Sequence, residues 1–420
     1  CCTAESVVLQ GDGSLSTIQQ IYHKRQAELL TLGKDWKFYL TRPSAFIDDG
    51  IKPVFRVTTR LGRFIETTIT HPFLTIKGWR QLGEIQVGDK IAVPRRMNIF
   101  GKETIRDCEV KLLAYLIGDG CLTQSAPHFT NGNTAILQDF AEAATSFGGL
   151  TLRFNDQGRR APEYRVIADR ECYTDNIKNF GYNLRSILQK RNLDPQKLAR
   201  ELNVPPRLFY SWMEGMAVPD REIFSRICEI LRVAPEHLAY DGIDVISTQH
   251  KNPLRHWLEE LGLMGKNAHQ KTVPDIVFRL QRSQVALFLN RLFSTDGWAT
   301  LLTSGQSQLG YCSVSEELAR QVQHLLLRFG IIAALKKRSV KYNNTRRPAW
   351  FIDITDAKSI KTFISEIGIF GKEVALSRVK EALENKKSHN NCDLIPVEAW
   401  EYLALAKGDE PWAVLAKRAG

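Results

Sequence analysis

The sequence has no apolar stretch long enough to cross a bilayer. A membrane-spanning helix needs roughly 20 consecutive apolar residues, and the longest candidate, LLLRFGIIAAL, is interrupted by Arg328. C-x-x-C pairs are also absent, and the 8 cysteines follow no metal-ligand spacing. These absences exclude a transmembrane protein, a disulfide scaffold and a zinc finger. We therefore expect free thiols in the reducing cytoplasm, and no membrane partner.

Acidic residues are outnumbered by basic ones, 46 Asp and Glu against 57 Lys and Arg, which leaves a net charge of +11. Such a balance favours a polyanionic partner. The composition, 43% hydrophobic and 25% charged, is that of a globular protein, and 420 residues suffice for two or three domains.

The chain begins with Cys1, and a T-x-x-H motif, Thr68 to His71, follows a strand-like run. A thiol at the first residue of a segment can attack the preceding peptide carbonyl and convert the amide to a thioester. Because the amide nitrogen is delocalised, the reaction needs a proton donor for that nitrogen, and histidine suits this near neutral pH. A threonine hydroxyl can hold the scissile carbonyl. Taken alone, the motif also fits strand residues with local hydrogen bonds.

Together with the segment ESVVL at 5–9 and the later run WRQLGEIQVGDKIAVPR, these residues resemble the N-terminal splicing blocks of inteins. The resemblance is greatest to inteins inserted in bacterial replicative DNA helicases. It implies that residues 1–100 form the N-terminal part of an all-β, horseshoe-shaped splicing (Hint) domain. Cys1 would be the nucleophile, Thr68 and His71 would assist, and flanking host segments would be partners. A hedgehog-like autoprocessing domain shares Cys1 and T-x-x-H but not the helices described next.

Two apolar, helix-like runs end in Asp-Gly: LLAYLIGDGCL at 112–122 and LFLNRLFSTDGWA at 287–299. A carboxylate opposes the dipole at a helix C-terminus, so stability alone does not select Asp119 and Asp296. If the helices pack together, the two like charges need a divalent cation between them. Such a site predicts Mg²⁺-dependent phosphodiester cleavage. Each Asp-Gly alone also fits an ordinary helix C-cap.

Both runs resemble the LAGLIDADG motif of homing endonucleases, which implies a monomer acting on double-stranded DNA. The fold implied is a pseudo-two-fold αββαββα endonuclease, with halves at 105–180 and 247–380. Asp119 and Asp296 would hold the metal. Lys271 falls on the family's basic catalytic position and would hold or polarise a water; otherwise it is a surface lysine.

Basic residues gather in one strand-like stretch of each half. A basic two-stranded ribbon can lie in the major groove and neutralise phosphates. We expect DNA contacts from Arg153, Arg159, Arg160 and Arg165 in the first half, and from Lys336, Lys337, Arg338, Lys341, Arg346 and Arg347 in the second. Each group alone also fits a solvated hairpin.

Residues 182–245 explain why the two motifs are so far apart. Their apolar residues recur at helical spacing, and the pattern resembles the helix-turn-helix domain of phage repressors. This all-α insert would present Arg207 and Tyr210 to DNA. Its basic and acidic residues nearly cancel, so a helical spacer remains the alternative.

Residues 393–420 lack the paired strands and His-Asn with which a splicing intein ends. His389-Asn390 lies in a polar run, and LAKRAG near the end echoes LAREL at 198–202. We expect 393–420 to be the poorly packed start of a truncated second helix-turn-helix, with the C-terminal splicing blocks missing and no ligation of flanking peptides.

The sequence as a whole predicts an intein carrying a site-specific, Mg²⁺-dependent homing endonuclease. The alternative is a DNA-binding regulator or degenerate nuclease without cleavage or splicing.

Overall fold

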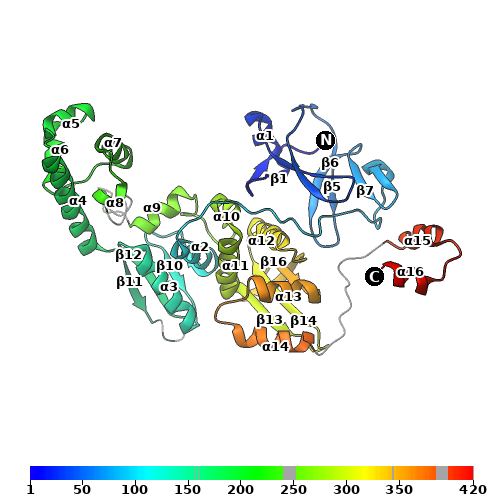
Figure 1. The fold of residues 1–420 in the computed structure, drawn as a ribbon. Coiled ribbons are helices and arrows are strands. Elements are labelled where there is room, and N and C mark those ends of the chain that lie inside the picture. Colours follow the sequence, from blue (N-terminus) through cyan, green and yellow to red (C-terminus); the bar gives the residue numbers. More distant parts are fainter. Residues whose placement is uncertain (157, 159, 240–251, 343–344, 385–395, 420) are drawn as a thin grey trace. The chain divides into compact units, whose positions relative to one another are not determined.

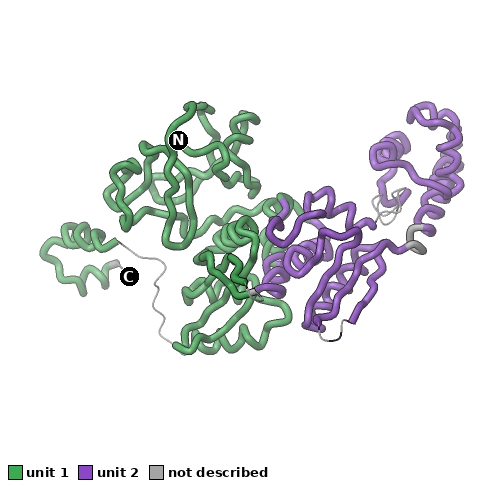
Figure 2. The backbone as a smooth tube through the Cα atoms, turned by 180° about the vertical axis from the view of Figure 1, so that it is seen from behind, with its two compact units in different colours: residues 1–104, 275–286, 297–420 green, residues 105–274, 287–296 purple. Residues whose placement is uncertain are grey.

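The computed structural model describes residues 1–156, 158, 160–239, 252–342, 345–384 and 396–419 (Figure 1). The chain divides into two compact units (Figure 2): residues 1–104, 275–286 and 297–420 form the first, and residues 105–274 and 287–296 the second. Within the described ranges, no helix has both the length and the apolar character that a bilayer crossing requires.

Residues 1–104 contain short antiparallel strand pairs. These are β1 (Val7–Leu9) with β2 (Leu15–Thr17), β3 (Leu29–Leu32) with β4 (Phe38–Thr41), β5 (Val54–Thr58) with β6 (Phe64–Thr68), and β7 (Pro72–Thr75) with β8 (Gly78–Gln81). The expected β structure is present as these strand pairs, and one short helix, α1 (Ile18–Lys24), accompanies it. A reciprocal cap starts this helix, since Thr17 Oγ1 accepts from the Gln20 amide and Gln20 Oε1 from the Thr17 amide. Seven residues are too few to display a helical period.

The second unit holds a four-stranded antiparallel sheet flanked by helices. Its elements are α2 (Asp107–Asp119), β9 (Gly120–Cys121), β10 (His128–Thr130), α3 (Thr134–Phe147), β11 (Leu150–Asn155) and β12 (Glu163–Ala168). The strand order is β9-β10-β12-β11. Residues 112–117 of α2 are consecutively buried, so this helix is enclosed on all sides rather than amphipathic.

The same element sequence recurs later in the chain. It comprises α11 (Arg282–Asp296), β13 (Gly297–Leu301), β14 (Ser307–Ser313), α12 (Glu316–Arg328), β15 (Ala334–Tyr342) and β16 (Thr345–Ile354). The strand order, β13-β14-β16-β15, repeats that of the first sheet. Further helices are α9 (Pro253–Glu260), α10 (Asp275–Arg279), α13 (Ala357–Glu366) and α14 (Glu373–Glu384). The predicted mixed α and β fold class is confirmed.

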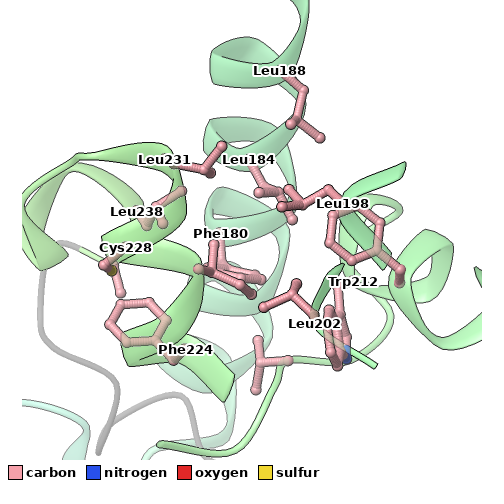
Figure 3. Packing of buried hydrophobic residues seen from close by; sticks show 14 of the residues in the cluster. Phe180, Leu184, Leu188, Leu198, Leu202, Trp212, Phe224, Cys228, Leu231 and Leu238 are labelled. Carbon is pink, nitrogen blue, oxygen red and sulfur yellow. The ribbon is translucent and has the colours of Figure 1, made fainter. Parts of the chain in front are cut away.

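Helices α4 to α8 form the segment predicted as an all-α insert. Their bounds are α4 (Arg170–Lys190), α5 (Pro195–Glu201), α6 (Pro206–Met213), α7 (Arg221–Leu231) and α8 (Pro235–Leu238). They enclose a core of their own, in which Phe180 and Trp212 are buried (Figure 3). Where α4 passes α6, a Cβ on Gly181 would lie 2.7 Å from the Trp212 carbonyl oxygen. Helix α4 runs through the expected border at 180–182, and the insert's core begins at Ile177. The border at 245–247 lies outside the described residues.

The last described segment contains α15 (Ala399–Lys407) and α16 (Trp412–Ala419). No side chain between residues 396 and 418 is buried, although the rings of Trp400 and Trp412 meet edge to face, 5.7 Å apart. The weak packing expected of 393–420 is therefore present in its described part. His389 and Asn390 lie outside the described residues.

Candidate functional site

Cys1 lies beside the end of strand β6. The Thr68 amide donates to the Cys1 carbonyl oxygen at 2.9 Å, and the Cys1 ammonium group donates to Thr68 Oγ1 at 2.8 Å. Cys2 forms an isolated antiparallel bridge with Thr67. The nitrogen of Cys1 here stands in for the amide nitrogen of the bond that would precede it. Thr68 Oγ1 thus contacts the Cys1 nitrogen, and the expected contact with the preceding carbonyl oxygen stays a prediction.

His71 closes the turn that follows β6. Its amide donates to the Thr68 carbonyl oxygen at 3.1 Å, and its own carbonyl oxygen accepts from the Leu82 amide at 2.9 Å. Its Nδ1 lies 4.0 Å from Cys2 Sγ. Burial lowers the pKa of His71, and the nearby N-terminal ammonium group lowers it further, so the imidazole is neutral at pH 7. The turn therefore brings a neutral histidine to the first residues.

Asp49 is a partner of Cys1 that sequence analysis missed. Cys1 Sγ donates to Asp49 Oδ2 at 2.8 Å. Because Asp48-Asp49-Gly50 is typical of a polar turn, nothing in the sequence associated this carboxylate with a thiol 48 residues away.

Helices α2 and α11 meet at their C-terminal ends within the second unit. A Cβ on Gly118 would lie 2.1 Å from Thr295 Oγ1, so only glycine permits this approach. Asp119 and Asp296 follow these two residues and end the two helices. The residue facing Gly118 is Thr295, whereas the neighbouring Ser294 is buried and donates to the Asn290 carbonyl oxygen.

Lys271 lies at the same helix ends. Its side chain is buried, and Nζ donates to the carbonyl oxygens of Leu116, Gly118 and Gly120 at 3.0, 3.0 and 2.7 Å. Burial lowers its pKa to about 8 although the charges of Asp296 and Asp119 act in the opposite direction. The surface-lysine interpretation was therefore wrong, and the ammonium group caps the C-terminus of α2.

Asn131 orients one of the two carboxylates. It follows β10, and its Nδ2 donates to Asp119 Oδ2 at 2.8 Å. Sequence analysis missed this residue because an asparagine after a short strand is an ordinary turn residue.

A buried ionic network joins three helices behind the aspartates. Asp139 on α3 accepts hydrogen bonds from Lys111 and Tyr115 of α2, at 2.7 and 2.6 Å. Arg291 of α11 donates to the same carboxylate at 2.8 and 3.2 Å. Burial opposes ionisation of Asp139, but the hydrogen bonds of Arg291, Lys111 and Tyr115 outweigh it and lower the pKa to about 2.

Comparison with known proteins identifies the family. A family model described as a LAGLIDADG-like domain matches residues 283–368. The replicative DNA helicase DnaB of Rhodothermus marinus is 27% identical over 95% of this chain and 35% of its own length. The Synechocystis DnaB is 26% identical over 96% of this chain and 39% of its own length. The chain thus spans little more than a third of these curated relatives.

The crystal structure of a DnaB intein from Synechocystis is 30% identical to this chain, with a TM-score of 0.22, and the match covers 22% of this chain and 68% of that one. The chain belongs to the family of DnaB inteins. It carries a LAGLIDADG-like endonuclease domain.

In the first half of the intein's endonuclease part, Arg153 of β11 and Arg165 of β12 are exposed and lie directly opposite each other. Like charges at opposed positions destabilise a sheet, and a bound polyanion relieves this repulsion. Arg160 is exposed in the connecting loop. Arg159 lies outside the described residues.

In the second half, Asp353 holds two of the basic residues predicted to contact DNA. Arg338 forms a hydrogen-bonded ion pair with Asp353 Oδ2, and Lys336 Nζ lies 3.8 Å from the same oxygen. Lys337 Nζ lies 5.5 Å from the centre of the Trp350 ring. The remaining three residues predicted for this ribbon are Lys341, Arg346 and Arg347, all exposed. Lys341 and Arg346 are directly opposed. The ribbon is thus partly neutralised near Asp353.

On the insert, Arg207 and Tyr210 are exposed on α6, whereas Phe209 and Trp212 of the same helix are buried. The residues expected to face DNA are therefore accessible. Among the described residues no group of three or more His, Cys, Asp or Glu is placed to hold a metal ion.

Proposed function

We propose that this intein breaks the peptide bond preceding Cys1 by an acyl shift. We propose further that its LAGLIDADG-like part cuts double-stranded DNA at a specific site with Mg²⁺. The contact between Gly118 and Thr295 is the observation that carries the nuclease proposal, because it brings two helix ends bearing Asp119 and Asp296 together beside Lys271.

In the acyl shift, Cys1 Sγ attacks the preceding carbonyl carbon, and the amide nitrogen leaves as an amine. Thr68 Oγ1 lies at hydrogen-bonding distance from that nitrogen and keeps it in place. A ring N–H of His71 would hydrogen-bond to the nitrogen as the bond breaks, and the leaving amine would take its proton from water. The flanking host segments of the helicase precursor are the substrate of this step.

The donor set at the α2 and α11 ends fits Mg²⁺, which prefers carboxylate oxygens and is often held by only one or two carboxylates together with waters and phosphates. Asp119 and Asp296 would hold it. When bound, the metal neutralises charge on the scissile phosphate and activates a water. Asn131 fixes one carboxylate oxygen, and the Lys271 ammonium group adds positive charge next to both aspartates.

The basic strands would hold the DNA duplex over this site. Arg153, Arg165, Lys341 and Arg346 form opposed like-charge pairs that phosphates would relieve. The insert, through Arg207 and Tyr210, would act as a helix-turn-helix contact that extends the recognised sequence. We expect one monomer to act on one duplex.

A DNA-binding regulator or degenerate nuclease is the alternative. The test is incubation of the chain with a DNA fragment that joins the two host-gene flanks without the intein, in Mg²⁺ and in EDTA. Mg²⁺-dependent cleavage near the insertion point supports the nuclease, whereas binding without cleavage supports the alternative.

A further inference from the structure

The Cys1 thiol has a carboxylate partner outside the turn that holds its nitrogen. Asp49 lies in the loop between β4 and β5, and its Oδ2 accepts from Cys1 Sγ at 2.8 Å. The same oxygen lies 2.5 Å from Lys52 Nζ, and both side chains are well exposed, 41% for Asp49 and 48% for Lys52. The loop therefore presents an ion pair to the sulfur.

The acyl shift requires an acceptor for the thiol proton. A cysteine thiol has a pKa of about 8.5, so only a few per cent of it is thiolate at pH 7. Thr68 Oγ1 accepts a hydrogen bond from the Cys1 nitrogen, and the Nδ1 of His71 lies 4.0 Å from Cys2 Sγ. Asp49 is the group that contacts the sulfur.

We propose that Asp49 is a catalytic residue that accepts the Cys1 thiol proton, which rests on the proposed acyl shift at Cys1. The S–H bond breaks, and its proton passes to Asp49 Oδ2. The sulfur electron pair forms a bond to the preceding carbonyl carbon, and the C–N bond of that amide then breaks. The leaving nitrogen takes one proton from water, and Asp49 returns the thiol proton to water, so an amide and a thiol become a thioester and an amine with no net change in protons.

The groups that face Asp49 are the Cys1 thiol, the Cys1 amino group and Lys52. The Lys52 hydrogen bond and charge lower the pKa of Asp49, and the Cys1 ammonium group lowers it further. In a precursor the Cys1 nitrogen is an uncharged amide, so only Lys52 remains to favour the carboxylate. Asp49 is therefore ionised, and able to accept a proton, at pH 6, where an unassisted thiol is protonated.

The test uses the full chain with a reporter peptide fused ahead of Cys1. Release of the reporter by dithiothreitol is timed between pH 5.5 and 9.5, and each variant is compared with wild type at the same pH so that titration of the reagent cancels. We expect Asp49→Asn to be on the order of 10²-fold slower at pH 6. The difference should disappear as the pH rises through about 8.5, where the thiol ionises unaided.

Asp48→Asn is the matched control, because Asp48 contacts the Gly50 amide and its hydrogen bonds do not involve the sulfur. We expect it to behave as wild type. Equal release by Asp49→Asn and wild type at pH 6, or a slowing that is the same at every pH, overturns the proposal, since the second result indicates only a structural role. If wild type releases no reporter at any pH, the acyl shift itself is wrong, and this assignment is wrong with it.

Discussion

The ammonium group of Lys271 is surrounded by three carbonyl oxygens from the C-terminal end of α2. That end of a helix carries partial negative charge, which makes it unfavourable for the carboxylate of Asp119. Lys271 offsets both charges, and because its pKa is about 8 it remains mostly protonated at pH 7. The Lys271 ammonium group thus caps the backbone of α2 and also reduces the electrostatic repulsion between the nearby carboxylates of Asp119 and Asp296.

Replacing either aspartate should abolish DNA cleavage while leaving binding nearly unchanged. Asp119→Asn and Asp296→Asn each remove a metal-ligand charge but no phosphate contact. Cleavage in Mg²⁺ and binding by gel shift are measured on the same DNA. Asp107→Asn, at the opposite end of α2, is the control and should cleave normally. Equal cleavage by wild type and both site variants would show that the aspartates are only helix caps.

The sequence could single out candidate site residues but not the groups that hold them in place. Cys1, Thr68, Asp119 and Asp296 stood out because their chemistry at those positions is poorly explained by stability alone. Their supporting residues did not stand out, since Asn131 resembles a turn residue and the three carbonyl partners of Lys271 are backbone atoms. Backbone acceptors leave no trace in the amino-acid sequence.

Helices α2, α3 and α11 are joined by the carboxylate of Asp139. One anion there faces two cations, Lys111 and Arg291, in a buried setting. Removal of one partner of a buried ion pair costs more than the pair contributes, because the remaining charge loses its compensation. The position of α11, and with it Asp296, therefore depends on Asp139.

Asp139→Asn should weaken the local stability of α11 by about 3 kcal/mol. The Asp139 pKa is about 2 in the folded chain against 3.8 otherwise. Its stabilisation is thus complete above pH 3.8 and is lost as the pH falls toward 2. In wild type, protection of the α11 amides from hydrogen exchange should fall as the pH is lowered from 3.8 toward 2. In Asp139→Asn, protection should change little over the same range. Glu142→Gln, on the exposed face of α3, is the control and should match wild type. If Asp139→Asn loses protection at acid pH as wild type does, titration of Asp139 is not the cause.

The two basic ribbons should differ in how each residue contributes to DNA binding. Arg165 faces Arg153 across a strand pair, so Arg165→Gln should reduce the slope of log affinity against log salt by about one unit. Arg338 already pairs with Asp353, so Arg338→Gln should change the slope less. Both substitutions are introduced into the Asp119→Asn protein, which is expected not to cleave DNA, and binding is titrated at several salt concentrations. Equal salt slopes for Arg165→Gln and Arg338→Gln would contradict this distinction.

The number of basic residues in the sequence could not predict this difference between Arg165 and Arg338. The sequence shows a basic stretch, but the pairing of Arg338 with Asp353 depends on the register of β15 against β16. Arg328, which belongs to the same basic stretch, is fully buried and donates to the Phe278 and Gly13 carbonyl oxygens. Helix α4 similarly continues across an expected domain border, because its residues from Ile177 onward already belong to the core of the insert.

Within the first unit, hydrogen bonds to the Leu61 carbonyl oxygen join the N-terminal strand region to the second half of the endonuclease part. The Leu335 amide donates to the Leu61 carbonyl oxygen at 3.0 Å, and Gln323 Nε2 donates to the same oxygen at 2.9 Å. Gly62, at φ +83°, has no room for a side chain, since a Cβ would lie 2.2 Å from the Leu335 carbonyl oxygen. Strand β6 thus connects this contact at one end with Thr68 at the other. Residues distant in sequence make up one folding unit, which no local pattern in the sequence could predict.

The insert offers a test that separates an added DNA contact from a spacer. Because its core begins at Ile177, the deletion should replace residues 177–239 with a flexible linker rather than begin at 182. If the insert contacts DNA, its deletion should speed release of the protein from DNA. The slope of log affinity against log salt should also fall by about one unit for each phosphate contact removed. Arg207→Gln in the full chain should give a smaller change of the same sign, since its neighbours Phe209 and Trp212 keep the core intact. Release rates are measured on immobilised DNA in the Asp119→Asn background, in which the DNA is expected to stay uncut. An unchanged rate and slope in both variants would establish the helices as a spacer.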